Sequence, residues 1–297
     1  MIEDAQKQQK KSMSNTYKID YTQIRQRPQI STMLDALERG LANFEIDFYL
    51  VGAVARDVWM NAINQTEPRR ATKDIDFAVF IKNTESYTQL KDYLIQNEGF
   101  APYRGNDFVL IWNNSLQVDL LPFGEIEDVD GRVTTNGVGL ASISMPGFRE
   151  IYETGLPELT LDNTHTFKFC TLPGIVLLKL IAFDDRPEAR RDDIKDISDI
   201  LKHFFDMYAE EIYENHNELF EDANDNLMHI AAQVLGREIK KITYRNPTLN
   251  QRVDNILMNN TNTLENSRIG QIMVEYFNNT VEENVLLLRY LLKGFTE

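Results

Sequence analysis

The spacing of hydrophobic and polar positions changes character near residue 172. Before that point, short apolar runs bounded by turn residues predict buried strands, and the segments between them have the spacing of amphipathic helices. After it, strand-like alternation fades, and long stretches such as LPGIVLLKLIAF and DIKDISDILKHFF have helical periodicity. The pattern predicts an α+β fold, in which an α/β core with a mixed sheet flanked by helices precedes a helical carboxy-terminal domain. The expected strands are 46–52, 74–81, 108–112 and 116–122, and the expected helices of the core are 30–44, 54–63 and 84–97.

Polar stretches and turn residues set the expected domain boundaries. Residues 1–28 are rich in Gln and Lys and lack an apolar run, so we expect a flexible amino-terminal arm there and no signal peptide. Residues 29–172 are expected to form the α/β core, and residues 173–297 the helical domain. Turn residues at 113–115 and 162–163 predict two hairpins within the core.

Composition excludes several classes of protein. The 297 residues are 42% hydrophobic and 26% charged, which is ordinary for a globular chain. A formal net charge of −15 repels nucleic-acid phosphate at long range, which argues against a general DNA-coating protein, and any contact with a polynucleotide would need a local basic patch. The single cysteine, Cys170, cannot form an intramolecular disulfide, and the four histidines show no metal-ligand spacing. The longest apolar stretch, 172–183, is too short for a bilayer, so we expect a soluble, cytoplasmic protein with no membrane partner.

Three aspartates carry the most informative chemistry. Asp74 and Asp76 open an expected strand, and because side chains alternate along a strand they point to the same face. Asp119 lies within a second expected strand, LQVDLLP, whose neighbouring positions are apolar. Strands disfavour aspartate, so three of them at these positions are a poor choice for stability alone. If the two strands are neighbours, the three carboxylates converge.

Converging carboxylates require compensation. Two charges about 4 Å apart repel by roughly 4 kcal/mol at an effective dielectric near 20, and a bound cation or a raised pKa relieves this. Oxygen-only ligands favour Mg²⁺ or Mn²⁺. The purely structural alternative is that Asp74 caps its strand, that Asp76 is solvated at an edge, and that Asp119 pairs with an arginine.

A glycine turn precedes the aspartate pair. The strand ending in Gly52-Ala53 leads directly into a helix, and backbone amides at such a turn are able to hold a triphosphate at the helix amino terminus. Taken alone, Gly52 is more often only the glycine of a tight turn.

These motifs together resemble the nucleotidyltransferase superfamily, the fold shared by DNA polymerase beta and the tRNA CCA-adding enzymes. The resemblance is carried by LVGAVARD, KDIDFAVF and LQVDLLPF, in which a strand and turn precede an Asp-x-Asp strand and a third aspartate. The segment 171–201 is similar to the one that follows the core in AbiEii-type nucleotidyltransferases, the toxin halves of some bacterial toxin–antitoxin pairs. At the second turn position this chain has Ala53, where the family usually has Gly or Ser.

The resemblance implies roles for particular residues. Asp74 and Asp76 would hold two Mg²⁺ or Mn²⁺ ions, and Asp119 would be the third ligand near the attacking hydroxyl. Four further residues would hold the nucleoside triphosphate: Gly52, Ala53, Arg56 and Lys179.

Two of these residues have structural alternatives. Lys179 interrupts an apolar helix, where a lysine commonly extends its ammonium group to solvent. Lys195, Asp196 and Asp199 lie on a helix face that is expected to be solvated. Asp196 would orient Lys179 or Lys195 by an ion pair. Arg56 would be an ordinary surface ion-pair partner if it does not contact phosphate.

The sequence therefore predicts a Mg²⁺-dependent nucleotidyltransferase that moves a nucleoside monophosphate from an NTP to an acceptor hydroxyl. The acceptor would be an RNA or tRNA end, a protein or a small molecule, and an antitoxin protein is a possible partner. The alternative is a non-catalytic protein of the same fold that binds a nucleotide or another protein. Ala53 and the strong acidity favour this alternative, whereas the presence of all three aspartates favours the enzyme.

Overall fold

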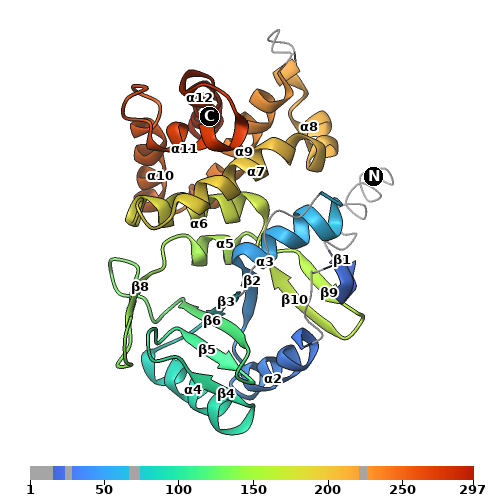
Figure 1. Ribbon diagram of the computed structural model, residues 1–297, viewed down its shortest axis with the longest axis vertical. Helices are drawn as coiled ribbons and strands as arrows, with labels where there is room; N and C mark the ends of the chain where they lie inside the picture. The colour runs from blue at the N-terminus through green and yellow to red at the C-terminus, as the bar shows by residue number, and fades with distance from the viewer. Residues whose placement is uncertain (1–15, 24–28, 67–73, 221–225) are drawn as a thin grey trace, which may run out of the picture. The chain divides into compact units, whose positions relative to one another are not determined.

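The computed structural model describes residues 16–23, 29–66, 74–220 and 226–297. They form a mixed eight-stranded sheet with helices around it, a small two-stranded sheet, and a long carboxy-terminal series of helices (Figure 1). The predicted α+β fold with a helical carboxy-terminal part is confirmed. None of the described helices is long and apolar enough to cross a membrane.

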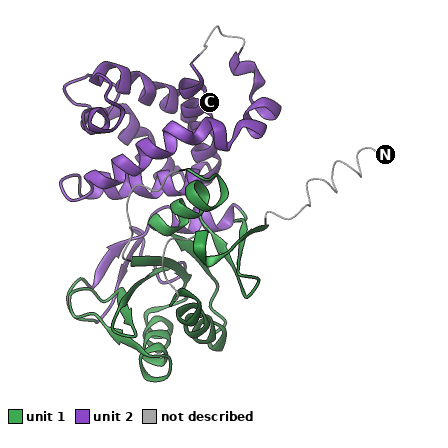
Figure 2. Cartoon of the chain, turned by 45° about the vertical axis from the view of Figure 1, so that its right-hand side comes forward, with its two compact units in different colours: residues 1–122, 137–140, 155–170 green, residues 123–136, 141–154, 171–297 purple. Residues whose placement is uncertain are grey.

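The chain divides into two units that interleave in the sequence (Figure 2). Unit 1 comprises residues 1–122, 137–140 and 155–170, and unit 2 comprises residues 123–136, 141–154 and 171–297.

Unit 1 is built on the eight-stranded sheet, whose strand order is β1-β9-β10-β2-β3-β6-β5-β4. Its helices α2 and α4 pack against each other, α2 also contacts β10, and α3 packs on β2 and β3. The strands are β1 (Thr16–Ile19), β2 (Phe48–Val51), β3 (Asp74–Phe80), β4 (Phe100–Pro102), β5 (Val109–Trp112), β6 (Leu116–Phe123), β9 (Glu158–Leu161) and β10 (His165–Phe169). The helices are α2 (Ile30–Asn43), α3 (Gly52–Asp57) and α4 (Thr84–Asn97), with a 3₁₀ turn η1 (Tyr21–Gln23) and a π-helix η2 (Val58–Ile63).

Both predicted hairpins are present. In the β5–β6 hairpin, Trp112 pairs with Leu116, and Asn113 and Asn114 have φ values of 46° and 56°. In the β9–β10 hairpin, Asp162 and Asn163 have φ values of 49° and 57°. Asn and Asp tolerate this left-handed region better than other non-glycine residues do, which is why these positions turn the chain.

The expected flexible arm over 1–28 differs from the structure where the chain is described. Thr16–Ile19 form edge strand β1, which pairs in parallel with β9, while 1–15 and 24–28 lie outside the described residues. The ring of Tyr17 makes edge-to-face contacts with Trp59 at 4.9 Å and with Phe169 at 5.7 Å. The strand is held by partners that are distant in sequence, so local composition does not reveal it.

The helix expected over 54–63 is also modified. It begins two residues earlier, at Gly52, and continues from α3 into the π-helix η2. Wider turns of this kind are uncommon and have no simple hydrophobic period, so the sequence pattern predicted only a regular helix.

Unit 2 is mainly helical, and its last helix packs closely on α9. A Cβ atom added at Gly294 would lie 1.8 Å from the carbonyl oxygen of Gln233, and one added at Gly236 would lie 2.1 Å from that of Leu291. Glycine at both positions therefore allows the two helix backbones to meet. The elements of unit 2 are β7 (Arg132–Thr134), β8 (Ser142–Ser144), α5 (Phe148–Glu153), α6 (Leu172–Asp185), α7 (Arg191–Met207), α8 (Ala209–Asn215), η3 (Asn217–Phe220), α9 (Leu227–Thr243), α10 (Pro247–Asn259), α11 (Arg268–Phe277) and α12 (Val281–Thr296).

Candidate active site

The three predicted aspartates come together in unit 1. Strands β3 and β6 are neighbours in the sheet, so Asp74 and Asp76 on one strand face the same region as Asp119 on the other. One carboxylate oxygen from each residue lies within 4.8 Å of those of the other two, and all three side chains are partly buried. Charges held this close in a partly desolvated position favour a bound cation.

The glycine turn lies directly against this cluster. Strand β2 runs antiparallel to β3 with Val51 opposite Asp76, so the residue after Val51 reaches the Asp76 side chain. Gly52 has a φ of 70°, and a Cβ atom there would lie 2.2 Å from Oδ2 of Asp76. Position 52 thus requires glycine for its backbone conformation and again for its space.

Asp119 is oriented by its own strand. The side-chain amide of Gln117 donates a hydrogen bond of 2.9 Å to Oδ1 of Asp119. Next to it in sequence, the carbonyl of Leu120 accepts a 2.8 Å bond from the buried hydroxyl of Tyr87. Burial raises the pKa of Tyr87 well above its ordinary value, and the charges of Asp107 and Asp119 add to this effect. The tyrosine therefore stays protonated and anchors the strand as a donor.

Arg56 and Ala53 lie on helix α3, which starts at the glycine turn. Arg56 is 4% exposed, and its guanidinium donates to Oδ1 of Asp57 from Nε at 3.0 Å and from Nη2 at 2.6 Å. The ion pair expected for Arg56 is thus present, but Arg56 itself is buried and only its partner Asp57 is partly exposed. Ala53 is partly exposed.

Lys179 lies in unit 2, where it is buried in a double ion pair. Its ammonium group is 2.7 Å from Oδ1 of Asp193 and 2.9 Å from Oδ2 of Asp196. The expectation that Lys179 extends to solvent is wrong, because two aspartates of α7 neutralise it where it lies. The ion pair expected between Asp196 and Lys179 is confirmed.

The face of α7 expected to be solvated is correspondingly revised. Asp196 and Asp199 are only 5% and 7% exposed, whereas Lys195 is exposed and pairs with Asp192 at 3.3 Å. Helix α7 contacts α6, α9 and α11, and these contacts on several sides bury its acidic residues.

The chemistry of the unit 1 cluster fits a hard divalent cation. Its donors are carboxylate oxygens alone, which Mg²⁺ and Mn²⁺ prefer, and three such charges compensate a doubly charged ion. Each of the three side chains is partly exposed, so the cluster is not sealed from solvent. Asp74, Asp76 and Asp119 are the residues that would hold the ion.

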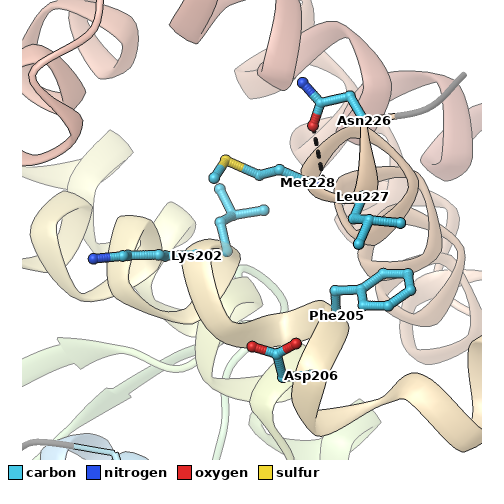
Figure 3. A pocket seen from close by; sticks show the side chains of 7 residues that line it. Lys202, Phe205, Asp206, Asn226, Leu227 and Met228 are labelled. Carbon is cyan, nitrogen blue, oxygen red and sulfur yellow. Dashed lines mark hydrogen bonds between the residues drawn. The ribbon is translucent and has the colours of Figure 1, made fainter.

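Two features of unit 2 were not predicted from the sequence. One is a pocket of about 600 Å³ lined by residues of α7 and of the start of α9, none of which is a predicted site residue (Figure 3). The other is a second group of possible metal ligands, Glu211, His216 and Glu238. Their spacing in sequence follows no metal-binding motif. The three residues meet only in the folded chain, where the end of α8 lies near α9.

Comparison with known proteins finds similarity to solved structures, but none to a family model or a curated sequence. No protein-family profile matches it, and no curated protein sequence matches it. Among solved structures, the chain is similar to the solution structure of the antibiotic-resistance factor ANT(2'')-Ia, with a TM-score of 0.31 and 13% sequence identity. The match covers 53% of this chain and 74% of that one.

Proposed function

We propose that unit 1 is a divalent-metal-dependent nucleotidyltransferase that moves a nucleoside monophosphate from an NTP to an acceptor hydroxyl. The observation that carries the proposal is the convergence of Asp74, Asp76 and Asp119 within 4.8 Å, beside a turn at Gly52 that permits only glycine. Ordinary sheet stability does not call for such an arrangement, because strands disfavour aspartate and like charges repel.

Each carboxylate has a distinct task in the proposed reaction. When bound, Mg²⁺ or Mn²⁺ neutralises charge on the transferring phosphate and on the leaving pyrophosphate. Asp74 and Asp76, which share one face of β3, would hold the metal ion in place. Asp119 orients the acceptor hydroxyl and accepts its proton as the new oxygen–phosphorus bond forms. The hydrogen bond from Gln117 fixes Oδ1 of Asp119 and so aims its other oxygen.

The proposal gives the turn at Gly52 and Ala53 the task of holding the triphosphate. With no side chain at position 52, the phosphate chain can approach the backbone amides closely. Arg56 lies at the other end of α3, where Asp57 of the same helix balances its charge, so it would contact phosphate only by sharing its guanidinium with Asp57. Lys179 would contribute as a phosphate contact only by sharing its charge with Asp193 and Asp196.

The resemblance of segment 171–201 to AbiEii-type toxins extends the proposal to a biological role. The chain would then be the toxin of a toxin–antitoxin pair, its acceptor an RNA or tRNA end, and its partner an antitoxin protein. A small regulatory gene next to this one, whose product neutralises the chain, is the observation that tests this role.

The second candidate is a non-catalytic protein of the same fold that binds a nucleotide. Ala53 favours it, because a serine at this position would supply a hydroxyl to phosphate and alanine supplies none. Under this alternative the chain binds metal and NTP but transfers nothing.

The test combines binding and transfer on the same preparations. Mg²⁺ with NTP at about 100 times its Kd is expected to add roughly 2.7 kcal/mol to the free energy of unfolding, and labelled nucleotide should appear in bulk RNA. The Asp74→Asn/Asp76→Asn variant should lose both, whereas Asp92→Asn, an exposed carboxylate on α4, should retain both. Binding without transfer to RNA, protein or small hydroxyl compounds supports the second candidate, and absence of binding contradicts both.

A further inference from the structure

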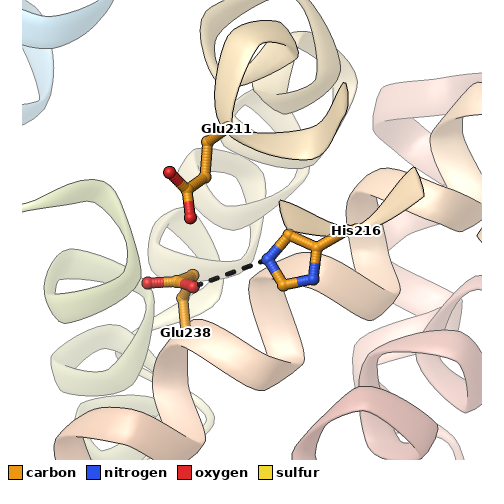
Figure 4. A group of neighbouring side chains, drawn as sticks. All are labelled: Glu211, His216 and Glu238. Carbon is orange, nitrogen blue, oxygen red and sulfur yellow. Dashed lines mark ion pairs between the residues drawn. The ribbon is translucent and has the colours of Figure 1, made fainter. Parts of the chain in front are cut away.

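A buried histidine and two glutamates meet between two helices of unit 2 (Figure 4). Glu211 lies on α8, His216 follows the last residue of that helix, and Glu238 lies on α9. One ligand atom of each lies within 4.8 Å of those of the other two. The group therefore comprises two carboxylates and one imidazole, a mixed oxygen and nitrogen donor set.

The imidazole of His216 points into this group without a partner. His216 is 5% exposed, and its Nε2 atom makes no hydrogen bond with any residue that the structure describes. The nearest carboxylate oxygen, Oε1 of Glu238, is 4.0 Å away, which is too far for a hydrogen bond. A buried nitrogen without a partner is costly, and a ligand between Nε2 and the carboxylates would remove that cost.

The other ring nitrogen shows what a ligand must overcome. Arg237 donates from Nη1 to Nδ1 of His216 at 2.8 Å, so in this arrangement the proton of the neutral ring is on Nε2. A metal ion at Nε2 requires that proton to leave and Nδ1 to become the donor instead. Arg237 also pairs with Glu218 and Glu297, so its charge remains compensated when it releases Nδ1.

Each glutamate is able to turn towards a cation. Glu211 is partly exposed and forms no ion pair with another described residue, and Glu238 is held by the exposed Lys241. Ligands about 2.0–2.1 Å from a tetrahedral metal lie about 3.4 Å apart, so the present spacing must contract by at most about 1.4 Å. Rotation about the side-chain bonds of two glutamates provides movement of this size.

We propose that Glu211, His216 and Glu238 form a binding site for one divalent transition-metal ion of the Zn²⁺ type. An imidazole nitrogen with two carboxylates suits Zn²⁺ or Co²⁺, whereas Mg²⁺ prefers oxygen ligands alone. The ion would link the end of α8 to α9. This site is separate in its residues and its metal preference from the three aspartates of unit 1.

The experiment uses the full chain with Asp74→Asn/Asp76→Asn, so that the proposed catalytic metal site does not contribute. Calorimetric titration is expected to show one equivalent of bound Zn²⁺, and Co²⁺ should give the visible absorption of a low-symmetry nitrogen and oxygen site. Nitrogen NMR of the four histidines should show the shift of metal binding at Nε2 of His216. Mg²⁺ should give neither the calorimetric binding nor the shift of His216.

Matched variants identify the ligands. Glu211→Gln, nearly isosteric and on a partly exposed position, should lower Zn²⁺ affinity by at least about tenfold. Glu210→Gln, the adjacent exposed glutamate of α8, should leave it unchanged. Lys241→Gln should raise affinity by up to about fivefold, because it releases Glu238 from a surface pair.

Three results would overturn the proposal. They are the absence of a bound equivalent of Zn²⁺, equal affinity in the Glu211→Gln and Glu210→Gln variants, and a histidine shift at a residue other than His216. His216→Asn, if folded by circular dichroism, should abolish the Co²⁺ absorption. If this buried variant does not fold, the glutamine variants decide. If the parent chain shows no nucleotidyl transfer, the proposed function fails, but this test of the metal site in unit 2 is unaffected.

Discussion

The backbone at Gly52 lies so close to the carboxylate of Asp76 that a Cβ atom there would be 2.2 Å from Oδ2 and 2.8 Å from Cγ. The closeness follows from the antiparallel register of β2 and β3, in which Val51 faces Asp76 and the turn begins at the next residue. The glycine turn and the pair Asp74 and Asp76 are therefore structurally coupled, and a substitution in one should alter the geometry of the other.

Gly52→Ala is expected to disable the proposed metal site. The substitution should cost roughly 1–2 kcal/mol of stability for the left-handed backbone, and it should also displace the Asp76 side chain. We expect loss of the Mg²⁺- and NTP-dependent rise in unfolding temperature, measured in thermal scans with and without ligands.

Gly155→Ala is the matched control for this change. Gly155 has a φ of 80°, similar to that of Gly52, but a Cβ atom there would meet nothing within 4 Å. The Gly155→Ala variant should lose a similar amount of stability through its left-handed backbone, but it should retain the rise in unfolding temperature with Mg²⁺ and NTP. Equal responses of the two variants would contradict the link between Gly52 and Asp76.

Much of the candidate site was predictable because its strands carry strong local signals. Strand β3 begins at Asp74 as expected, and β6 extends one residue beyond the predicted range. The alternation of side chains along β3 was enough to place Asp74 and Asp76 on one face. The convergence with Asp119 was conditional, because it depends on β3 and β6 being neighbours, and sheet order is set by contacts across the whole unit.

What the sequence did not predict depends on packing between distant segments. The burial of Asp196 and Asp199 results from contacts of α7 with α6, α9 and α11, and the periodicity of one helix does not reveal which other helices pack on it. The meeting of Glu211, His216 and Glu238 has the same origin. In each case, polar residues that would suit a solvated helix are enclosed by elements far away in the sequence.

Lys179→Met is expected to destabilise unit 2 strongly. The substitution leaves Asp193 and Asp196 buried without their main counter-charge, and breaking a buried ion pair in this way costs about 3–5 kcal/mol. Chemical denaturation of the variant measures the loss. Lys195→Met, which breaks only an exposed pair with Asp192, should cost about 1 kcal/mol or less. If the two variants are equally stable and only Lys179→Met loses transfer, Lys179 acts as a phosphate contact.

His229 is expected to make the protein less stable in mild acid. Burial lowers the pKa of His229 below its ordinary value, so the unfolded chain binds this proton more tightly than the folded one. As the pH falls below about 6.5, protonation of the unfolded state begins to draw the chain towards unfolding, until the folded pKa is reached. Above about pH 6.5, His229 is neutral in both the folded and the unfolded chain, so it does not make the stability depend on pH.

The His229→Gln variant isolates this contribution. The ring of His229 stacks on Tyr290 with centroids 4.3 Å apart, so the variant will lose some stability at every pH. The informative quantity is the difference in unfolding free energy between the parent and the variant, followed from pH 8 to pH 5. That difference should shrink below about pH 6.5. A difference that is constant across the range, or that grows in acid, contradicts the assigned direction of the pKa shift.

Asp119→Asn is expected to separate ligand binding from transfer. Asparagine is nearly isosteric, so strand β6 and its pairing with β5 should survive, but the amide cannot accept the proton of the acceptor hydroxyl. Asp74 and Asp76 remain to hold the metal, so NTP-dependent stabilisation should persist at reduced strength. Transfer of labelled nucleotide should fall by about 10² to 10⁴, the range for one positioned acid–base group. Asp92→Asn serves as the exposed control. Failure of the Asp119→Asn variant to fold would make Asp119 a structural residue, and unchanged transfer would show that another carboxylate receives the proton.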